Sequence, residues 1–190
     1  MRAGRQAGGA PVTLAELAAK LADIMAAPKD AAPVETLCLR PNYGQRDFVE
    51  EITVTRANGM PGERWNTAPW MRLADGSPDP RIQVSILGRR VMDAVWRDRE
   101  NTPHPGDPII ADIDTSEANM PTGQLLAIGS AVLRVSDVFN DACVKWKTRY
   151  GKDAKDWIVL PENIPLRLRG VLCEVVQDGR IRLGDPIRKV

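Results

Sequence analysis

The chain has 190 residues, 43% of them hydrophobic and 27% charged, a composition typical of one globular domain, with or without a short appendage. Its formal net charge of +1 provides no global field for binding nucleic acid or an anionic membrane surface, and no apolar run approaches the roughly 18 to 20 residues of a membrane-spanning helix. The three cysteines are far apart, and the opening residues lack the pattern of a secretory leader, so we expect a cytoplasmic protein without a disulfide framework.

A helix is predicted from Thr13 to about Ala27. Thr13 and Glu16 form the pattern of a capping box, and apolar residues recur after them at helical spacing. Pro28 ends the helix, because proline cannot continue the ladder of backbone hydrogen bonds.

The segment after this helix, residues 29–33, is typical of a linker. We therefore expect two parts: an N-terminal helix with its linker over residues 1–33, and a main domain over residues 34–190. The apolar face of the helix is expected either to pack on the main domain or to dock on a second subunit, which makes a homodimer plausible.

Beyond the linker the apolar period changes to two, or to short β-branched runs bounded by turn residues, and these patterns indicate strands. The predicted strands are residues 34–40, 48–55, 81–87, 108–112, 124–128, 131–136, 170–177 and 180–183. The last two flank Asp178-Gly179, a pair that favours a two-residue turn, and so predict a β-hairpin.

Two short helices are predicted among the strands, at residues 89–97 and 142–150. Each is too short to be stable alone and must pack on the sheet. Many short strands, frequent Gly and Pro, and few helices favour a mainly β fold. We expect a closed or nearly closed β-barrel with a few short helices and an N-terminal helix, because closure removes exposed strand edges.

Cys143 is the first candidate for a reactive group. It lies in the segment 140–147, where Asp141 can cap a helix and place the thiol in its first turn. Unpaired backbone N–H groups and the helix dipole favour a thiolate there, and Lys147 adds positive charge one turn along. The local sequence favours equally a small buried residue that happens to precede a helix.

The other two cysteines have mainly structural interpretations. Cys173 lies within a continuous apolar run that predicts a core strand, and Cys38 alternates with larger apolar neighbours. A structural zinc site is not expected, because no Cys-x-x-Cys pair occurs and His104 is the one histidine. His104 lies in a stiff Pro-containing turn and is expected to be a solvent-exposed loop residue.

Two arginines stand beside glycines in patterns that suit anion binding. In the turn 59–65, two glycines allow the backbone to bend and Arg64 could present its planar donor fork to an oxyanion. Arg169 precedes Gly170 at the entrance to a strand. An ordinary hairpin loop and a solvated surface charge are the alternatives.

Segments of the main domain resemble, in order, the motifs of one known family. Residues 37–41 and 49–55 resemble its first strands, and residues 59–64 resemble its Gly-x-x-Gly-Asp-Arg turn. Residues 83–86 and 91–93 resemble the strand and short helix that come next.

The remaining motifs follow in the same order. Residues 116–123 and 126–135 are close to the family's Asn-Leu-Pro-x-Gly and Ile-Gly-x-Ala-x-Leu-x-Val patterns. Residues 143–145 stand where the family places its cysteine, and residues 169–171 and 179–186 resemble its closing hairpin.

This order, over roughly residues 34–190, resembles the MOSC domain, the module that forms the C-terminal part of molybdenum cofactor sulfurases, in a stand-alone bacterial-type form. The family's fold is a β-barrel with short helices. Departures concern the substrate pocket: Glu63 and Trp65 replace an Asp and a frequent His, Gly106 is followed by Asp107 and not by the Asn frequent in relatives, and Ala142 replaces a Pro.

The resemblance implies that the protein handles sulfur, the molybdenum cofactor (molybdopterin), or both. Cys143 would then carry a persulfide or ligate molybdenum, because a thiolate is both a nucleophile and a soft metal ligand. The residues expected to hold the cofactor, with its phosphate, are Arg64, Asn119, Lys145, Lys147 and Arg169.

Partners follow from what the chain lacks. It has no domain that resembles a pyridoxal-phosphate desulfurase, so sulfur would come from a separate cysteine desulfurase, and pyridoxal phosphate would belong to that partner. Two alternatives stay open. One is a molybdenum-dependent reductase of N-hydroxylated compounds, which would need an electron donor or a molybdoenzyme partner; the other is a non-catalytic ligand-binding barrel.

Overall fold

Ten short strands form the sheets of the protein in a computed structural model that describes residues 10–190, so that the opening residues of the expected 1–33 segment lie outside the described residues. The strands are β1 (Ala32–Leu39), β2 (Asp47–Val49), β3 (Glu51–Val54), β4 (Val84–Gly88), β5 (Ile109–Ala111), β6 (Leu125–Ile128), β7 (Ala131–Val135), β8 (Val171–Gln177), β9 (Gly179–Arg182) and β10 (Pro186–Lys189).

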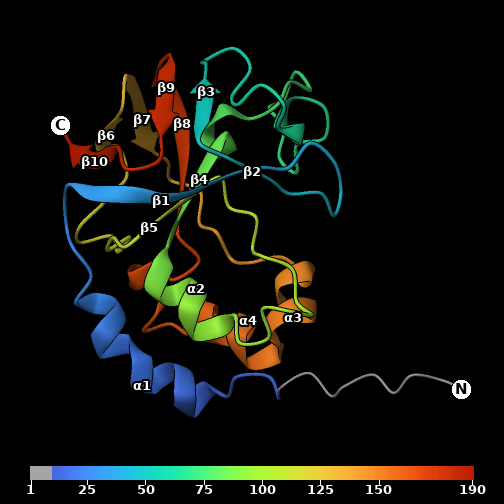
Figure 1. Cartoon of the computed structure of the whole chain (residues 1–190), viewed down its shortest axis with the longest axis vertical. Helices are drawn as coiled ribbons and strands as arrows, with labels where there is room; N and C mark the ends of the chain where they lie inside the picture. Colours follow the sequence, from blue (N-terminus) through green and yellow to red (C-terminus); the bar gives the residue numbers. More distant parts are fainter. Residues whose placement is uncertain (1–9) are drawn as a thin grey trace, which may run out of the picture.

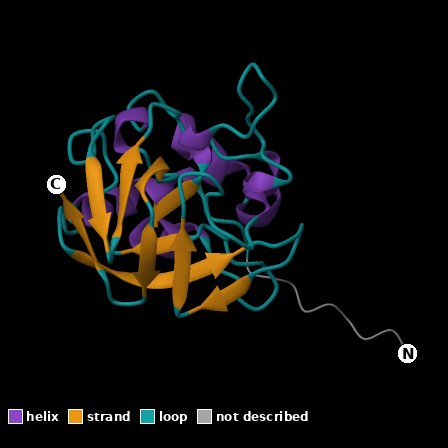
Figure 2. Cartoon of the chain, turned by 90° about the horizontal axis from the view of Figure 1, so that it is seen from above, coloured by secondary structure: helices purple, strands orange, loops and turns teal. Residues whose placement is uncertain are grey.

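Seven of these strands close into a barrel, which confirms the predicted fold class. Their order is β10-β6-β7-β8-β4-β5-β1, and a further pairing of β10 with β1 closes the ring. β4 and β5 pair in parallel, while the other pairs are antiparallel. β2 adds an eighth strand at the edge of β1, and Figures 1 and 2 show how the strands curve around one interior.

The barrel interior is filled by branched aliphatic side chains that alternate along the strands, as expected for strands with one face toward a core. They include Val84, Ile86, Ile109, Leu126, Ile128, Leu133, Val175 and Ile187.

Four helices gather on one side of the barrel (Figure 1): α1 (Leu14–Met25), α2 (Arg89–Val95), α3 (Val144–Tyr150) and α4 (Lys152–Val159). They enclose a second core between themselves and outward-facing residues of β4 and β5. Leu87 and Ile110 contribute from these strands, and Leu17, Trp146 and Trp157 contribute from the helices.

The helix α1 confirms the predicted capping box. The Glu16 N–H donates to Thr13 Oγ1 at 3.3 Å, and the Thr13 N–H donates to Glu16 Oε2 at 2.8 Å. Its apolar residues Leu17 and Ile24 are buried against the chain's own α2 and α4. The helix thus packs on the body of the protein, which is one of the two alternatives expected for its apolar face.

The predicted hairpin at Asp178-Gly179 is wrong. β8 pairs with β7 and β4, whereas β9 leaves the barrel ring and pairs with β3 in a separate two-stranded sheet. Asp178 accepts hydrogen bonds from the backbone and side chain of Arg56 instead of closing a tight turn. A Cβ at Gly179 would lie 2.4 Å from the Ala131 nitrogen, so the glycine is needed for close backbone approach.

Two further predicted strands have different bounds in the structure, and two elements of the structure were not predicted. The predicted strand 48–55 divides at Glu50 into β2 and β3, which belong to different sheets. The predicted strand 81–87 starts as a 3-10 turn at Pro80–Ile82, because Asp79 caps it and proline fixes its first residue. The helix α4 and the strand β10 are not predicted. α4 places Ala154, Trp157 and Ile158 on its buried face, but it has only 8 residues, and β10 has only 4, so each signal covers a short segment.

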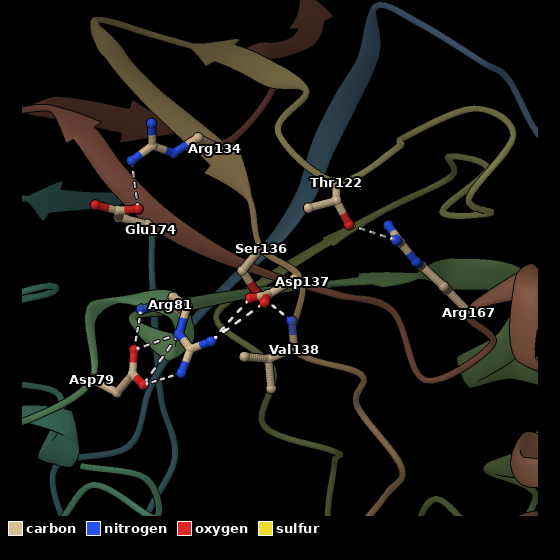
Figure 3. A network of polar contacts seen from close by, with 9 residues as sticks. All are labelled: Asp79, Arg81, Thr122, Arg134, Ser136, Asp137, Val138, Arg167 and Glu174. Atoms are coloured by element: carbon tan, nitrogen blue, oxygen red, sulfur yellow. Dashed lines mark hydrogen bonds and ion pairs between the residues drawn. The ribbon is translucent and has the colours of Figure 1, made fainter. Parts of the chain in front are cut away.

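Charged side chains tie the outer surface of the barrel together (Figure 3). Arg81 donates to Asp79 and to Asp137, which links the 3-10 turn to the loop after β7. Arg134 and Glu174 face each other across β7 and β8 and pair at 2.8 Å. An exposed pair such as Arg134–Glu174 contributes at most about 1 kcal/mol, whereas Asp79 is buried beneath Arg81.

No helix within residues 10–190 is long and apolar enough to cross a membrane. The same part of the chain holds no cluster of three or more His, Cys, Asp or Glu side chains arranged to bind a metal ion.

Candidate functional site

An open pocket lies where the end of β1 and the loop that follows it meet the start of α3. Its cavity volume is about 80 Å³. We call it the Cys143 pocket; its lining residues are Arg40, Asn42, Tyr43, Gly44, Gln45, Arg46, Arg64, Pro105, Cys143, Lys145, Trp146, Arg149 and Arg169.

Cys143 is exposed and forms part of the pocket wall. It is itself the N-cap residue of α3, with an extended backbone, so the prediction that Asp141 caps the helix and puts Cys143 in its first turn is wrong. The helix begins later because Ala142 adopts a left-handed conformation, with φ of 62°. Lys155 of α4 holds this residue by donating to the Ala142 carbonyl oxygen at 2.9 Å.

The other two thiols are buried, as their sequence contexts indicate. Cys173 lies in the barrel core, where burial raises its pKa to about 12. Cys38 is buried on β1, and burial raises its pKa to about 11 despite nearby cationic groups. Cys143 is therefore the thiol that a reagent or partner can reach from solvent.

Two of the predicted site residues meet over one aromatic ring. The Arg64 guanidinium and the Lys145 ammonium each lie 4.4 Å from the centre of the Tyr43 ring. Cation–π attraction holds both cations at the pocket although Tyr43 itself is 65% exposed. Gly59 and Gly62, both at positive φ, bend the turn that delivers Arg64, as predicted.

Arg169 forms another part of the wall and is far from being a solvated surface charge. Its side chain is 13% exposed and donates to the buried carboxylate of Asp107 at 2.8 Å. Its guanidinium also lies 4.4 Å from the Trp146 ring. Burial alone would raise the pKa of Asp107, but the charge and hydrogen bond of Arg169 outweigh it and hold that pKa below its usual value.

Arg40 and Arg46 extend over Gly106. A Cβ at that position would lie 3.1 Å from Arg40 Cδ and 3.1 Å from Arg46 Nε, so the glycine allows the two side chains to converge. Arg40 is paired with the buried Glu63 at 3.2 Å. Glu63, which replaces the Asp of the family turn, thus anchors a pocket cation.

Six cations and no carboxylate line the Cys143 pocket. Glu63 and Asp107 lie beneath the wall and compensate Arg40 and Arg169. The remaining four cations, Arg46, Arg64, Lys145 and Arg149, form no ion pair with any residue of the described chain. The pocket therefore has a strongly positive potential on a protein of nearly neutral charge.

Two residues predicted to bind the cofactor do not line this pocket. Lys147 is exposed on α3 outside it. Asn119 lies elsewhere: its amide donates to the backbone oxygens of Lys29 and Asp114, and its oxygen accepts from Lys189. Asn119 thus joins the linker after α1 to the last strand.

His104 is buried, and the expectation of a solvent-exposed residue is wrong. Its ring packs edge-on against Phe48 and Trp96, and its Nδ1 accepts from the Gly106 N–H at 3.0 Å. Burial lowers its pKa to about 4. The accepting nitrogen and the apolar surroundings both require the neutral ring.

This neutral histidine predicts how stability depends on pH. Because its folded pKa lies below the unfolded value of about 6.5, the unfolded chain binds more protons between these values. The contribution of the neutral ring to the free energy of unfolding is therefore fully present above about pH 6.5. It falls, on the order of 2 kcal/mol in total, as the pH drops toward 4. Urea titrations at pH 7.5 and pH 5 measure this decrease in the free energy of unfolding.

The sequence offers a clean control for that dependence, because His104 is the chain's one histidine. We expect H104Q to be less stable than the wild type at pH 7.5, and its free energy of unfolding should change much less between pH 7.5 and pH 5. If the change is as large in H104Q as in the wild type, groups other than His104 cause the pH dependence.

Sequence patterns missed several members of the site. Arg149 was not predicted, although it lies four residues after the predicted Lys145 on α3, a spacing that places both on one helix face. Arg46 lies in a polar loop with no local signal. Tyr43 and Asp107 gain their roles from partners distant in sequence, Arg64 and Arg169.

The residues present suit a phosphate-bearing cofactor with a soft metal. Cys143 offers a thiol, the ligand type that a soft metal prefers. The buried Nε atoms of Arg46 and Arg169 have no hydrogen-bond partner in the described chain and remain as donors. A thiol beside unpaired guanidinium donors fits the donor set that the molybdenum cofactor requires.

No protein-family model matches the chain, and no curated protein matches it either. Solved structures do. The YuaD protein from Bacillus subtilis aligns over 83% of this chain and 94% of its own, with a TM-score of 0.60 and 17% identity. YiiM from Escherichia coli aligns over 85% of this chain and 69% of its own chain, with a TM-score of 0.55 and 17% identity. At this identity the likeness concerns the fold alone: the chain has a barrel architecture similar to that of YuaD and YiiM.

Proposed function

We propose that the protein binds the molybdenum cofactor in the Cys143 pocket and that Cys143 handles sulfur or ligates molybdenum there. One observation carries the proposal: the single exposed thiol opens on a pocket lined by six cations and no carboxylate. The MOSC-like barrel and the order of the sequence motifs support it.

The cationic wall serves two purposes in this proposal. It attracts an anionic ligand, and Arg64 and Arg169 offer planar donor forks that match phosphate oxygens. It also lies beside the exposed Cys143 thiol, so that an anionic ligand would be held next to the sulfur. Binding and positioning would therefore depend on the same residues.

As a sulfur carrier, Cys143 would react with the persulfide of a separate cysteine desulfurase. The Cys143 thiolate attacks the outer sulfur of that persulfide, a new S–S bond forms, and the donor's S–S bond breaks. The donor cysteine leaves as a thiolate, and Cys143 becomes the persulfide. No outside oxidant is needed, because the transferred sulfur keeps its oxidation state.

As a metal ligand, Cys143 would contribute its sulfur, while Arg46, Arg64, Lys145 and Arg169 hold the phosphate end of the cofactor. When bound, the cofactor supplies a metal centre capable of redox and sulfur chemistry. This chain's residues bind and orient it, and Trp146 keeps Arg169 in place through its ring.

Expression with molybdate followed by metal and pterin analysis tests the proposal. We expect the purified protein to retain molybdenum and pterin, and C143S to lose the metal. Protein free of cofactor should take up labelled sulfur from a cysteine desulfurase if Cys143 is a carrier. If the protein neither retains the cofactor nor takes up sulfur, the proposal is wrong and the non-catalytic ligand-binding barrel is the alternative that stands.

A matched control moves the thiol by one residue. Val144 is 71% exposed, so V144C in the C143S background restores a reachable cysteine outside the original position. We expect iodoacetamide to label the native protein and this double variant but not C143S. Recovery of molybdenum by the double variant would contradict a defined role for Cys143.

A further inference from the structure

We infer that the ligand of the Cys143 pocket carries at least two linked phosphoryl groups, as in a diphosphate ester, rather than a single phosphate. The inference rests on the proposed function, because it takes this pocket as the ligand site. It adds the chemical class of the anion, which neither the fold nor the motifs specify.

The first argument is charge balance. Four pocket cations, Arg46, Arg64, Lys145 and Arg149, lack ion-pair partners among the described residues. A phosphate monoester carries a charge of about −1.5 to −2 at neutral pH, which leaves about two of these four positive charges without a counter-charge. A second phosphoryl group is needed to approach neutrality.

The second argument is the placement of the cations. Arg64 and Lys145 meet at the Tyr43 ring, each 4.4 Å from its centre. Arg46 instead approaches Arg40 over Gly106. The donors thus form two groups, which suits two anionic centres joined by a bridge.

The third argument concerns Arg46. Burial lowers its pKa first, and the positive charge of Arg149 lowers it further. Its Nε is buried and has no hydrogen-bond partner in the described chain, while one of its Nη atoms donates to the Gly44 carbonyl oxygen. Without a ligand, the repulsion between Arg46 and Arg149 and the unpaired buried N–H of Arg46 both cost free energy. An anion bound by Arg46 and Arg149 would relieve the repulsion and accept a hydrogen bond from that N–H.

Inorganic pyrophosphate and orthophosphate are the probes that test this inference. Their binding to the cofactor-free full chain is measured by calorimetry at one ionic strength. We expect pyrophosphate to bind at least about tenfold more tightly than orthophosphate, since one added charge-assisted contact is worth about 1.5 kcal/mol or more. The Arg149 side chain has no hydrogen bond or ion pair to another side chain of the described residues, so R149Q should fold normally and lower the ratio.

R134Q is the matched control, because Arg134 is an exposed arginine paired with Glu174 on the far strands β7 and β8. It should leave both affinities unchanged. The diphosphate inference would be overturned if the two anions bind with equal affinity, or if R134Q and R149Q lose equal affinity for pyrophosphate. Either result would leave the proposal that the pocket binds a cofactor with a single phosphate. If neither anion binds and the metal is also absent from protein expressed with molybdate, both proposals fail together.

Discussion

Replacing Asp107 with alanine is expected to lower the free energy of unfolding by about 3–5 kcal/mol, the cost typical of leaving one partner of a buried ion pair alone. Asp107 is fully buried and accepts from Arg169 and from Ser85 Oγ, each at 2.8 Å. Its removal leaves the Arg169 guanidinium, 13% exposed, without a counter-charge. Urea denaturation at pH 7.5 measures the loss.

A double-mutant cycle separates the ion pair from the packing. If the unpaired charge causes the damage, D107A combined with R169M should be less destabilised than the sum of the two single variants. Additive effects would show that Asp107 acts through its contact with Ser85 and through packing alone. D107N, which keeps an oxygen for Ser85, should lie between the wild type and D107A.

Ala142→Pro is the second substitution with a large expected effect, a loss of about 3 kcal/mol in stability together with slower alkylation of Cys143. Proline holds φ near −65°, whereas Ala142 has a φ of 62°. The backbone must therefore turn away, and the hydrogen bond from Lys155 to the Ala142 carbonyl oxygen is lost. Thermal melts and iodoacetamide labelling measure both consequences.

Ala142→Gly is the matched control. Glycine adopts the left-handed conformation without strain, which offsets the loss of one buried methyl group and the entropy of a more flexible unfolded chain. We expect it to change stability by less than about 1 kcal/mol and to leave the labelling rate close to that of the wild type. A proline variant as stable and as reactive as this control would contradict the geometry described around Cys143.

The proline substitution also bears on the resemblance to the MOSC family. The family pattern places proline immediately before its cysteine, and this chain has Ala142 there. The left-handed backbone at Ala142 is closed to proline, so the segment leading to Cys143 follows a path that the family pattern does not predict. Transfer of pocket details from the family to this segment is therefore limited.

Local patterns predicted most of the elements but not all of their partners. The capping box at Thr13 and the strand runs depend on residues near each other in sequence, and they appear where expected. The Asp178-Gly179 pair failed as a hairpin signal, because the partner of β9 is chosen by the distant strand β3 and by close contact with the backbone at Ala131. His104 failed for a similar reason: its burial depends on Phe48 and Trp96.

The sequence by itself determined the β-barrel class, the N-terminal helix and the choice of Cys143 as the thiol to examine, because apolar periodicity, caps and motif order are local properties of the chain. Only the tertiary structure decided where the charges gather. A net charge of +1 says nothing about their distribution, and the fold brings Arg46, Arg64 and the α3 residues Lys145 and Arg149 from three segments to one pocket. Coulomb interactions depend on distance in space, and that distance is fixed by strand pairing and packing rather than by position along the chain.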